Sequence, residues 1–143
     1  MFINQISVFM ENKKGRLSSL TRILAENKID LVALSIADTA DYGIMRAIVN
    51  RTEEAERVLR QAGFMVSTTK VLGVVVPDSP GGLADVLDIF TQGDISVEYL
   101  YSFVRNQGRN ALIMFKVSPC DKAVELLRSH GIGLVTQQQV NSL

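Results

Sequence analysis

The stretch PDSPGGLADVLDIF, residues 77–90, joins a strand-like run to a helix-like run. Before it, apolar residues alternate with their neighbours at Leu72, Val74 and Val76, which predicts a strand with one buried face. Within it, apolar residues recur at helical spacing, at Leu83, Val86, Leu87 and Phe90. Pro80, Gly81 and Gly82 lie at the junction, so the chain is expected to turn tightly there, with Ser79 as N-cap and Pro80 as first helical residue.

The same arrangement occurs earlier in the chain, where ENKKGRL (residues 11–17) precedes another helix-like run. Identical residues pair at one constant offset: Val8 with Val74, Gly15 with Gly81 and Leu17 with Leu83. Further along, the offset is larger by two, and it pairs Val49 with Val117, Ala55 with Ala123 and Gly63 with Gly131. The two extra residues of the second copy fall where the turn-like segment 37–43 aligns with the turn-like segment 104–110, and turns are where insertions are best tolerated. The sequence therefore predicts two repeated units, residues 1–69 and 70–143.

Each unit has the same predicted element order. After the first strand and helix come two strand-like segments, at residues 29–37 and 43–50 and again at 95–104 and 111–117. A second helix is expected from Thr52 and from Ser118, with Pro119 in its first position and with Gly63 or Gly131 at its end. A last strand is expected at 64–71 and 133–140. The fold class is α+β: two tandem ferredoxin-like βαββαβ units, each a four-stranded antiparallel sheet with two helices on one face.

Bulk properties limit the kind of protein. The 143 residues are 47% apolar, with fifteen positive and fifteen negative side chains, which excludes nucleic-acid binding through bulk positive charge. No apolar run approaches the roughly 20 residues that span a bilayer, and the N-terminus lacks the pattern of a signal peptide. A single cysteine fits a reducing compartment, so we expect a cytoplasmic protein with neither a membrane nor a nucleic-acid partner.

The strand-to-helix turns are the candidate sites. A glycine lets another molecule approach the backbone, and the first amides of a helix suit a carboxylate or another anion. The alternative is that Gly15 and Gly81 only form a tight turn and relieve packing against the sheet. The residues alone leave both interpretations open.

The pattern D-x-P-G-x-L at Asp78–Leu83, followed by G-D-I-S-V at Gly93–Val97, resembles the ACT domain. The first unit carries a divergent copy, with Asn12–Leu17 and then Ile29–Leu31 in the matching positions. The resemblance covers essentially the whole chain twice, like a stand-alone tandem ACT protein with no catalytic domain.

The resemblance implies regulatory binding of a small molecule, most often an amino acid, at an interface between two units. The open faces and edges of the predicted sheets need covering, so a homodimer is expected. A regulated enzyme is the expected partner, and with no catalytic motif in the sequence neither an enzyme activity nor a cofactor is expected. Backbone amides at Gly15 and Gly81 would hold the ligand carboxylate, and Asp30 or Asp78 its ammonium group. The ligand-binding residues carried over are Asn12, Lys14, Gly15, Arg16, Leu17, Asp30, Asp78, Ser79, Pro80, Gly81, Gly82, Leu83 and Ser96. Lys14 and Arg16 depart from the small, proline-bearing pattern, and Lys14 is expected to be a solvated rim residue.

Other features favour structural roles. Tyr99, Tyr101 and Phe103 share one predicted sheet face, as in RNA-recognition modules, but no basic stripe accompanies them. His130 fits a helix C-terminus and Cys120 a partly buried structural thiol, and no metal-ligand spacing or catalytic motif is present. A different class of function stays open: a dimerising scaffold whose ligand site is vestigial.

Overall fold

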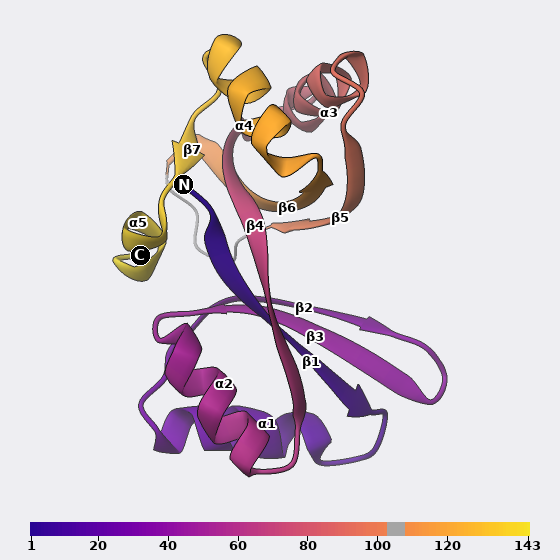
Figure 1. The fold of residues 1–143 in the computed structure, drawn as a ribbon, viewed down its shortest axis with the longest axis vertical. Coiled ribbons are helices and arrows are strands. Elements are labelled where there is room, and N and C mark those ends of the chain that lie inside the picture. The colour runs from indigo at the N-terminus through magenta and orange to yellow at the C-terminus, as the bar shows by residue number, and fades with distance from the viewer. Residues whose placement is uncertain (103–107) are drawn as a thin grey trace. The chain divides into compact units, whose positions relative to one another are not determined.

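The computed structural model describes residues 1–102 and 108–143. Two compact units form within it: Asn4–Thr69, and Lys70–Leu143 together with Met1–Ile3. Strand β4, Met65–Pro77, continues through the boundary between them, so its first part belongs to one unit and its second part to the other (Figure 1). Among the described helices, none is both long and apolar enough to cross a membrane.

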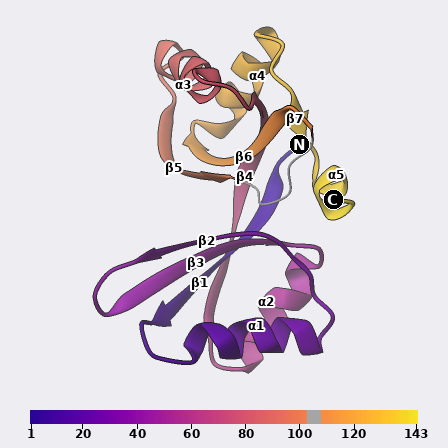
Figure 2. The ribbon, with the colours of Figure 1, turned by 180° about the vertical axis from the view of Figure 1, so that it is seen from behind.

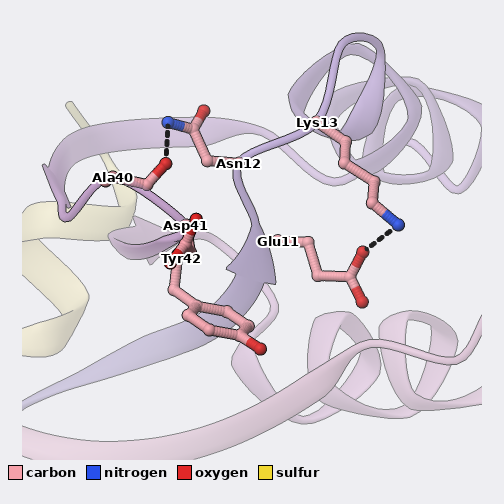
Figure 3. Close-up of a pocket in the computed structure, with 6 residues that line it drawn as sticks. All are labelled: Glu11, Asn12, Lys13, Ala40, Asp41 and Tyr42. Carbon is pink, nitrogen blue, oxygen red and sulfur yellow. Dashed lines mark hydrogen bonds and ion pairs between the residues drawn. The ribbon is translucent and has the colours of Figure 1, made fainter.

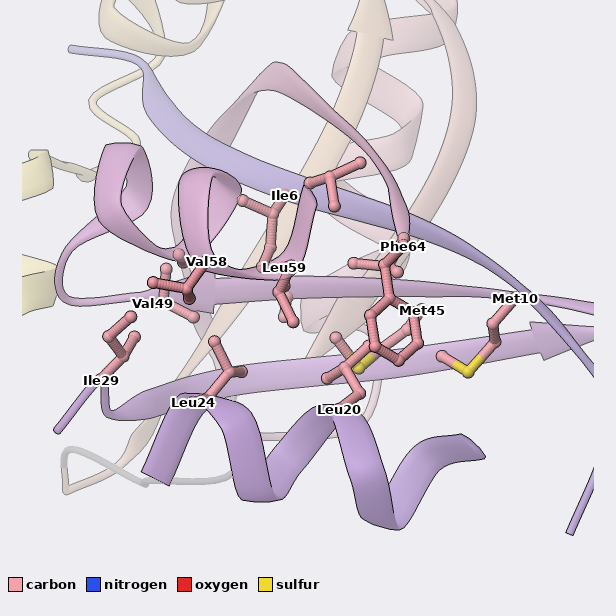
Figure 4. Close-up of a cluster of buried hydrophobic side chains, with 14 residues drawn as sticks. Ile6, Met10, Leu20, Leu24, Ile29, Met45, Val49, Val58, Leu59 and Phe64 are labelled. Carbon is pink, nitrogen blue, oxygen red and sulfur yellow. The ribbon is translucent and has the colours of Figure 1, made fainter. Parts of the chain in front are cut away.

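The unit Asn4–Thr69 is a four-stranded sheet covered by two helices. Its strands are β1 (Ile3–Glu11), β2 (Leu31–Asp38), β3 (Tyr42–Val49) and the first part of β4, in the spatial order β2-β3-β1-β4. Helices α1 (Arg16–Glu26) and α2 (Thr52–Gln61) lie on the same face of this sheet (Figures 1 and 2). Side chains from that face and from both helices form the core, including Leu20, Leu24, Met45, Leu59 and Phe64 (Figure 4).

The unit Lys70–Leu143 has the same plan. The second part of β4 is followed by α3 (Gly82–Gln92), β5 (Ser96–Ser102), β6 (Asn110–Ser118), α4 (Cys120–Ser129), β7 (Leu134–Val135) and α5 (Gln137–Asn141). The spatial order β5-β6-β4-β7 matches that of the first unit, strand for strand. Its core is centred on Phe90 and Phe115, whose rings meet edge to face with centroids 5.4 Å apart.

The internal repeat holds down to backbone detail. Helices α1 and α3 occupy matching positions of the repeat and are equally long, and the same is true of α2 and α4. Both second strands carry an irregularity in register at the same place, between Leu31 and Ala33 and between Val97 and Tyr99. Lys28 and Asp94 follow the first helix of each unit with the same rare positive φ, 55° and 56°. The predicted tandem ferredoxin-like fold is confirmed.

The predicted second-unit strand at 133–140 is wrong beyond Val135. Thr136 instead caps the short helix α5: its hydroxyl accepts a hydrogen bond from the Gln139 amide at 3.2 Å. The Gln139 side chain in turn accepts one from the Thr136 amide at 2.8 Å. This reciprocal capping box outweighs the strand-like alternation of the sequence.

The start of α4 also differs from the prediction. Helix α4 begins at Cys120, and Pro119 is its N-cap residue with an extended backbone, φ −73° and ψ 134°. Pro119, predicted to be the first helical residue, is therefore the N-cap instead, and the helix begins one position later than predicted. Gly63 and Gly131 follow α2 and α4 with φ of 90° and 70°, as expected of helix-ending glycines.

Leu20 and Leu17 provide a matched test of this core. Leu20 is fully buried in α1, whereas Leu17, one turn earlier, is 40% exposed. We expect Leu20→Ala to lower the free energy of unfolding by about 2–5 kcal/mol and Leu17→Ala by well under about 1 kcal/mol. Urea denaturation followed by far-UV circular dichroism measures both, and equal losses would contradict this packing.

Candidate functional site

The turns that lead into α1 and α3 have nearly the same backbone. Gly15 caps α1 with φ 87° and ψ −9°, and Gly81 caps α3 with φ 90° and ψ −14°. Both conformations are left-handed, a region that side-chain-bearing residues rarely adopt, so the backbone favours glycine in both units.

Hydrogen bonds fix both turns in the same way. The Arg16 amide donates to the Lys13 carbonyl at 3.2 Å, and the Gly82 amide donates to the Ser79 carbonyl at 3.0 Å. Each turn is also tied to the neighbouring hairpin: the Asn12 amide donates to the Asp41 carbonyl at 2.9 Å, and the Asp78 amide to the Arg109 carbonyl at 3.0 Å. The turn geometry therefore survives although most of its side chains differ.

The predicted roles of Ser79 and Pro80 are wrong. Both residues lie in the turn before the helix, and Gly81 is the N-cap. A glycine has no side chain, so neither α1 nor α3 receives a side-chain cap from its N-cap residue. The Arg16 and Gly82 amides already donate within the turns, so among the described residues it is the amides after them in the first helical turn that are left for another acceptor. Such amides bind carboxylates and other anions.

Gly81 and Gly82 have different physical roles. A Cβ built on Gly81 or Gly15 would meet nothing within 4 Å, so the space beside both residues is open. A Cβ on Gly82 would lie 2.2 Å from the Pro77 carbonyl oxygen, so Gly82 permits close packing of backbone on backbone. The first unit has Arg16 at the position of Gly82.

Beside the Gly15 turn lies a polar pocket of about 410 Å³, lined by Glu11, Asn12, Lys13, Ala40, Asp41 and Tyr42 (Figure 3). The Asn12 side-chain amide donates to the Ala40 carbonyl at 3.5 Å, which places it against the hairpin. Lys13 pairs with Glu11 at 2.6 Å, and this hydrogen-bonded ammonium lowers the pKa of the Glu11 carboxyl.

Sequence reasoning found only Asn12 among these pocket-lining residues. The hairpin members Asp41 and Tyr42 were missed because they lie far from the turn along the chain, a separation at which only strand pairing shows proximity. The predicted β2–β3 hairpin was the available signal.

Arg16 and Lys14 behave differently. The Arg16 guanidinium lies over the Phe64 ring, 4.3 Å from its centroid, and Arg16 Nε is buried with no hydrogen-bond partner among the described residues. Lys14 is exposed, in keeping with a rim position. Arg16 therefore covers one end of the core of the first unit, whereas Lys14 extends into solvent.

Asp30 and Ser96 lie away from the turns of their own units. The Asp30 amide donates to Asn50 Oδ1 at 3.0 Å, and Ser96 pairs with Ser118, so both residues lie where the third strand of the unit ends. The turns adjoin Asp41 and Arg109, just before the same strands begin. The predicted site residues at 12–17 therefore lie together in the first unit, and those at 78–83 lie together in the second. Asp30 does not join the first group, and Ser96 does not join the second.

A family model described as an ACT domain pair matches residues 1–143 of this chain. The chain belongs to the ACT domain family. Its two units are the two ACT domains of that pair.

Solved structures agree with this assignment. Protein BT0572 from Bacteroides thetaiotaomicron is 36% identical, with a TM-score of 0.94 over 100% of this chain and 98% of that one. The regulatory subunit of aspartate kinase from Thermus thermophilus, in its ligand-free form, is 15% identical, with a TM-score of 0.68 over 90% of both chains. That of Thermus flavus is 12% identical, with a TM-score of 0.63, over 88% of this chain and 90% of that one. A comparison with curated proteins gave no significant match.

The other residues considered in the ACT pair have structural surroundings. Tyr101 is buried, Tyr99 is half-buried, and Phe103 lies outside the described residues. The His130 Nδ1 atom lies 2.9 Å from the Leu126 carbonyl oxygen at the end of α4. Cys120 is half-buried, and this burial raises the pKa of its thiol. Among residues 1–102 and 108–143, no group of three potential metal ligands occurs.

The two adjacent glycines of the second ACT unit should respond differently to alanine. Gly81→Ala adds backbone strain of about 1 kcal/mol but no clash. Gly82→Ala forces the Pro77 carbonyl to move, so its loss of stability should be larger, about 3 kcal/mol. Chemical denaturation of the two variants measures this difference, and an equal or reversed ranking would refute the close approach at Gly82.

Proposed function

We propose that this ACT pair is a regulatory protein that binds a small molecule, an amino acid, at the turns before α1 and α3. The observation that supports the proposal most is the pair of turns itself. Both keep a left-handed glycine, an uncapped helix start and open space beside the glycine, although their side chains differ. A requirement that backbone amides face a ligand accounts for that combination.

The charges near the turns suit a zwitterion. A ligand carboxylate would accept hydrogen bonds from the amides that follow Arg16 or Gly82 in the first helical turn. In the second unit, Asp78 offers a carboxylate for the ligand ammonium group. In the first unit Asn12 stands at that position, and the carboxylate of Asp41, which lines the same pocket, takes over this role. Leu17 and Leu83 would contact the apolar part of the ligand's side chain.

Asp30 and Ser96 would contact a ligand only where ACT units assemble with one another. Since neither lies at the turn of its own unit, each would contact a ligand held by a different turn, which fits the proposed homodimer. A regulated enzyme would then respond to the ligand, to an extent limited by the ligand's differential affinity for two states of the ACT pair.

A scaffold with a vestigial site is the second candidate. Arg16 favours it, because the first unit fills the position of Gly82 with a side chain that lies on Phe64. A scaffold would keep the turn for folding alone and would bind no small molecule there.

Thermal unfolding in the presence of each of the twenty amino acids separates these candidates. At a hundredfold excess over its dissociation constant, a ligand adds about 2.7 kcal/mol, which raises the unfolding midpoint by several degrees. We expect one amino acid, or a chemically related group, to give this shift. A flat response at millimolar concentrations would favour the scaffold.

Substitution of Gly81 then tests where the ligand binds. Gly81→Ala introduces a methyl group into the open space at the start of α3, so we expect at least about a tenfold loss of affinity by calorimetry. Gly63→Ala is the matched control, because Gly63 has the same φ of 90° and also no atom within 4 Å of a Cβ. The two variants should lose similar stability. If Gly81→Ala binds like Gly63→Ala, the ligand does not contact the α3 turn.

A further inference from the structure

The second unit contains another pocket, of about 270 Å³, lined by Phe2, Lys70, Lys116, Cys120 and Asp121. Lys70 lies in β4, Lys116 lies near the end of β6, and Cys120 begins α4. The Gly81 turn adjoins Arg109, just before β6 begins. The pocket is therefore separate from the turn, since the length of β6 lies between them.

Two lysines, Lys70 and Lys116, line this pocket together. Within the described residues, neither Lys70 nor Lys116 forms an ion pair. Lys70 Nζ lies 5.7 Å from the centroid of the Phe2 ring, and Lys116 is half-buried. Both ammonium groups are close enough to Cys120 to favour its thiolate, although burial raises the pKa of the thiol more strongly. With Asp121 as the one carboxylate of the lining, the pocket carries excess positive charge.

The internal repeat shows that the fold itself does not require these lysines. Asn4 and Ile48 stand at the positions of Lys70 and Lys116 in the first unit. Thr52 and Glu53 correspond to Cys120 and Asp121. The same βαββαβ frame therefore forms with neither cation, so the two lysines are free to serve a role other than folding.

We propose that this pocket binds a compact dianion, such as a phosphate monoester or a small dicarboxylate, through Lys70 and Lys116. Lysine ammonium groups are point charges with three donors each, which suits oxyanions of either kind. The first-turn amides of α4, which begins at Cys120, lie in the same wall and add to the positive potential. The protein would then have a second ligand-binding site, separate from the turns before α1 and α3.

Cys120 makes the proposal directly testable, because it is the single cysteine of the chain and lines the pocket. The rate of its alkylation by iodoacetamide, an uncharged reagent, is measured by mass spectrometry at constant ionic strength with chloride, inorganic phosphate or succinate. A bound dianion covers the thiol and offsets the lysine charges that favour the thiolate, so alkylation should slow at least about fivefold. Half-protection is expected at about 1 mM, the range of weak specific binding.

Variants separate a bound anion from general screening. Lys70→Gln with Lys116→Gln should raise the half-protecting concentration at least about tenfold, with each variant compared with its own rate in chloride. Lys122→Gln is the matched control, since Lys122 lies on the same helix but does not line the pocket. Far-UV circular dichroism verifies that all variants are folded.

Protection by either dianion, or by both, that the double variant loses supports the proposal. Protection by phosphate alone points to a phosphate monoester, and protection by succinate alone points to a dicarboxylate. Protection by neither, or protection that the double variant retains, overturns the proposal. None of these outcomes depends on whether an amino acid binds at the turns, so this proposal and the proposed function can fail separately.

Discussion

The structure depends on one backbone requirement: each first strand must pass into a helix that packs back on the same sheet. At Gly15 and Gly81 this takes a residue with φ of 87° or 90°, which glycine alone adopts without strain. The choice has a second effect, because a glycine N-cap has no oxygen with which to satisfy the helix amides. A folding requirement thus creates unsatisfied donors at the surface of both units. The amino-acid site proposed at the turns depends on those donors.

The duplication provides an internal comparison of fold and chemistry. Backbone geometry is nearly the same in both units, down to the positive φ of Lys28 and Asp94. Charge is not: Asn12 and Asp41 correspond to Asp78 and Arg109, and Arg16 corresponds to Gly82. The two turns are therefore similar in shape and different in electrostatics. The same comparison isolates Lys70 and Lys116 as additions to the second unit.

Most of the fold could be predicted from the sequence because its signals are local or repeated. The spacing of Leu83, Val86 and Phe90 indicates one apolar face of a helix. The aligned residues of the first copy give the same prediction, so each element is predicted twice. The prediction was wrong where two local signals competed: Thr136 and Gln139 form a capping box within a strand-like alternation. The site was harder to predict, because its geometry depends on tertiary contacts. Only the folded chain places Asp41 beside Asn12, Arg16 over Phe64, and Asp30 beside Asn50.

Strand β4 has a consequence for how the chain tolerates change. Val66 belongs to the core of the first unit, and Leu72, Val74 and Val76 belong to the core of the second, so one strand supplies both cores from its even-numbered positions. Side chains alternate along a strand with a period of two. This alternation has to hold within each part of β4 by itself, because Val66 packs only in the first core and Leu72, Val74 and Val76 pack only in the second. A polar side chain at Val66 would therefore disrupt the first core and one at Val74 the second, although both residues belong to the same strand.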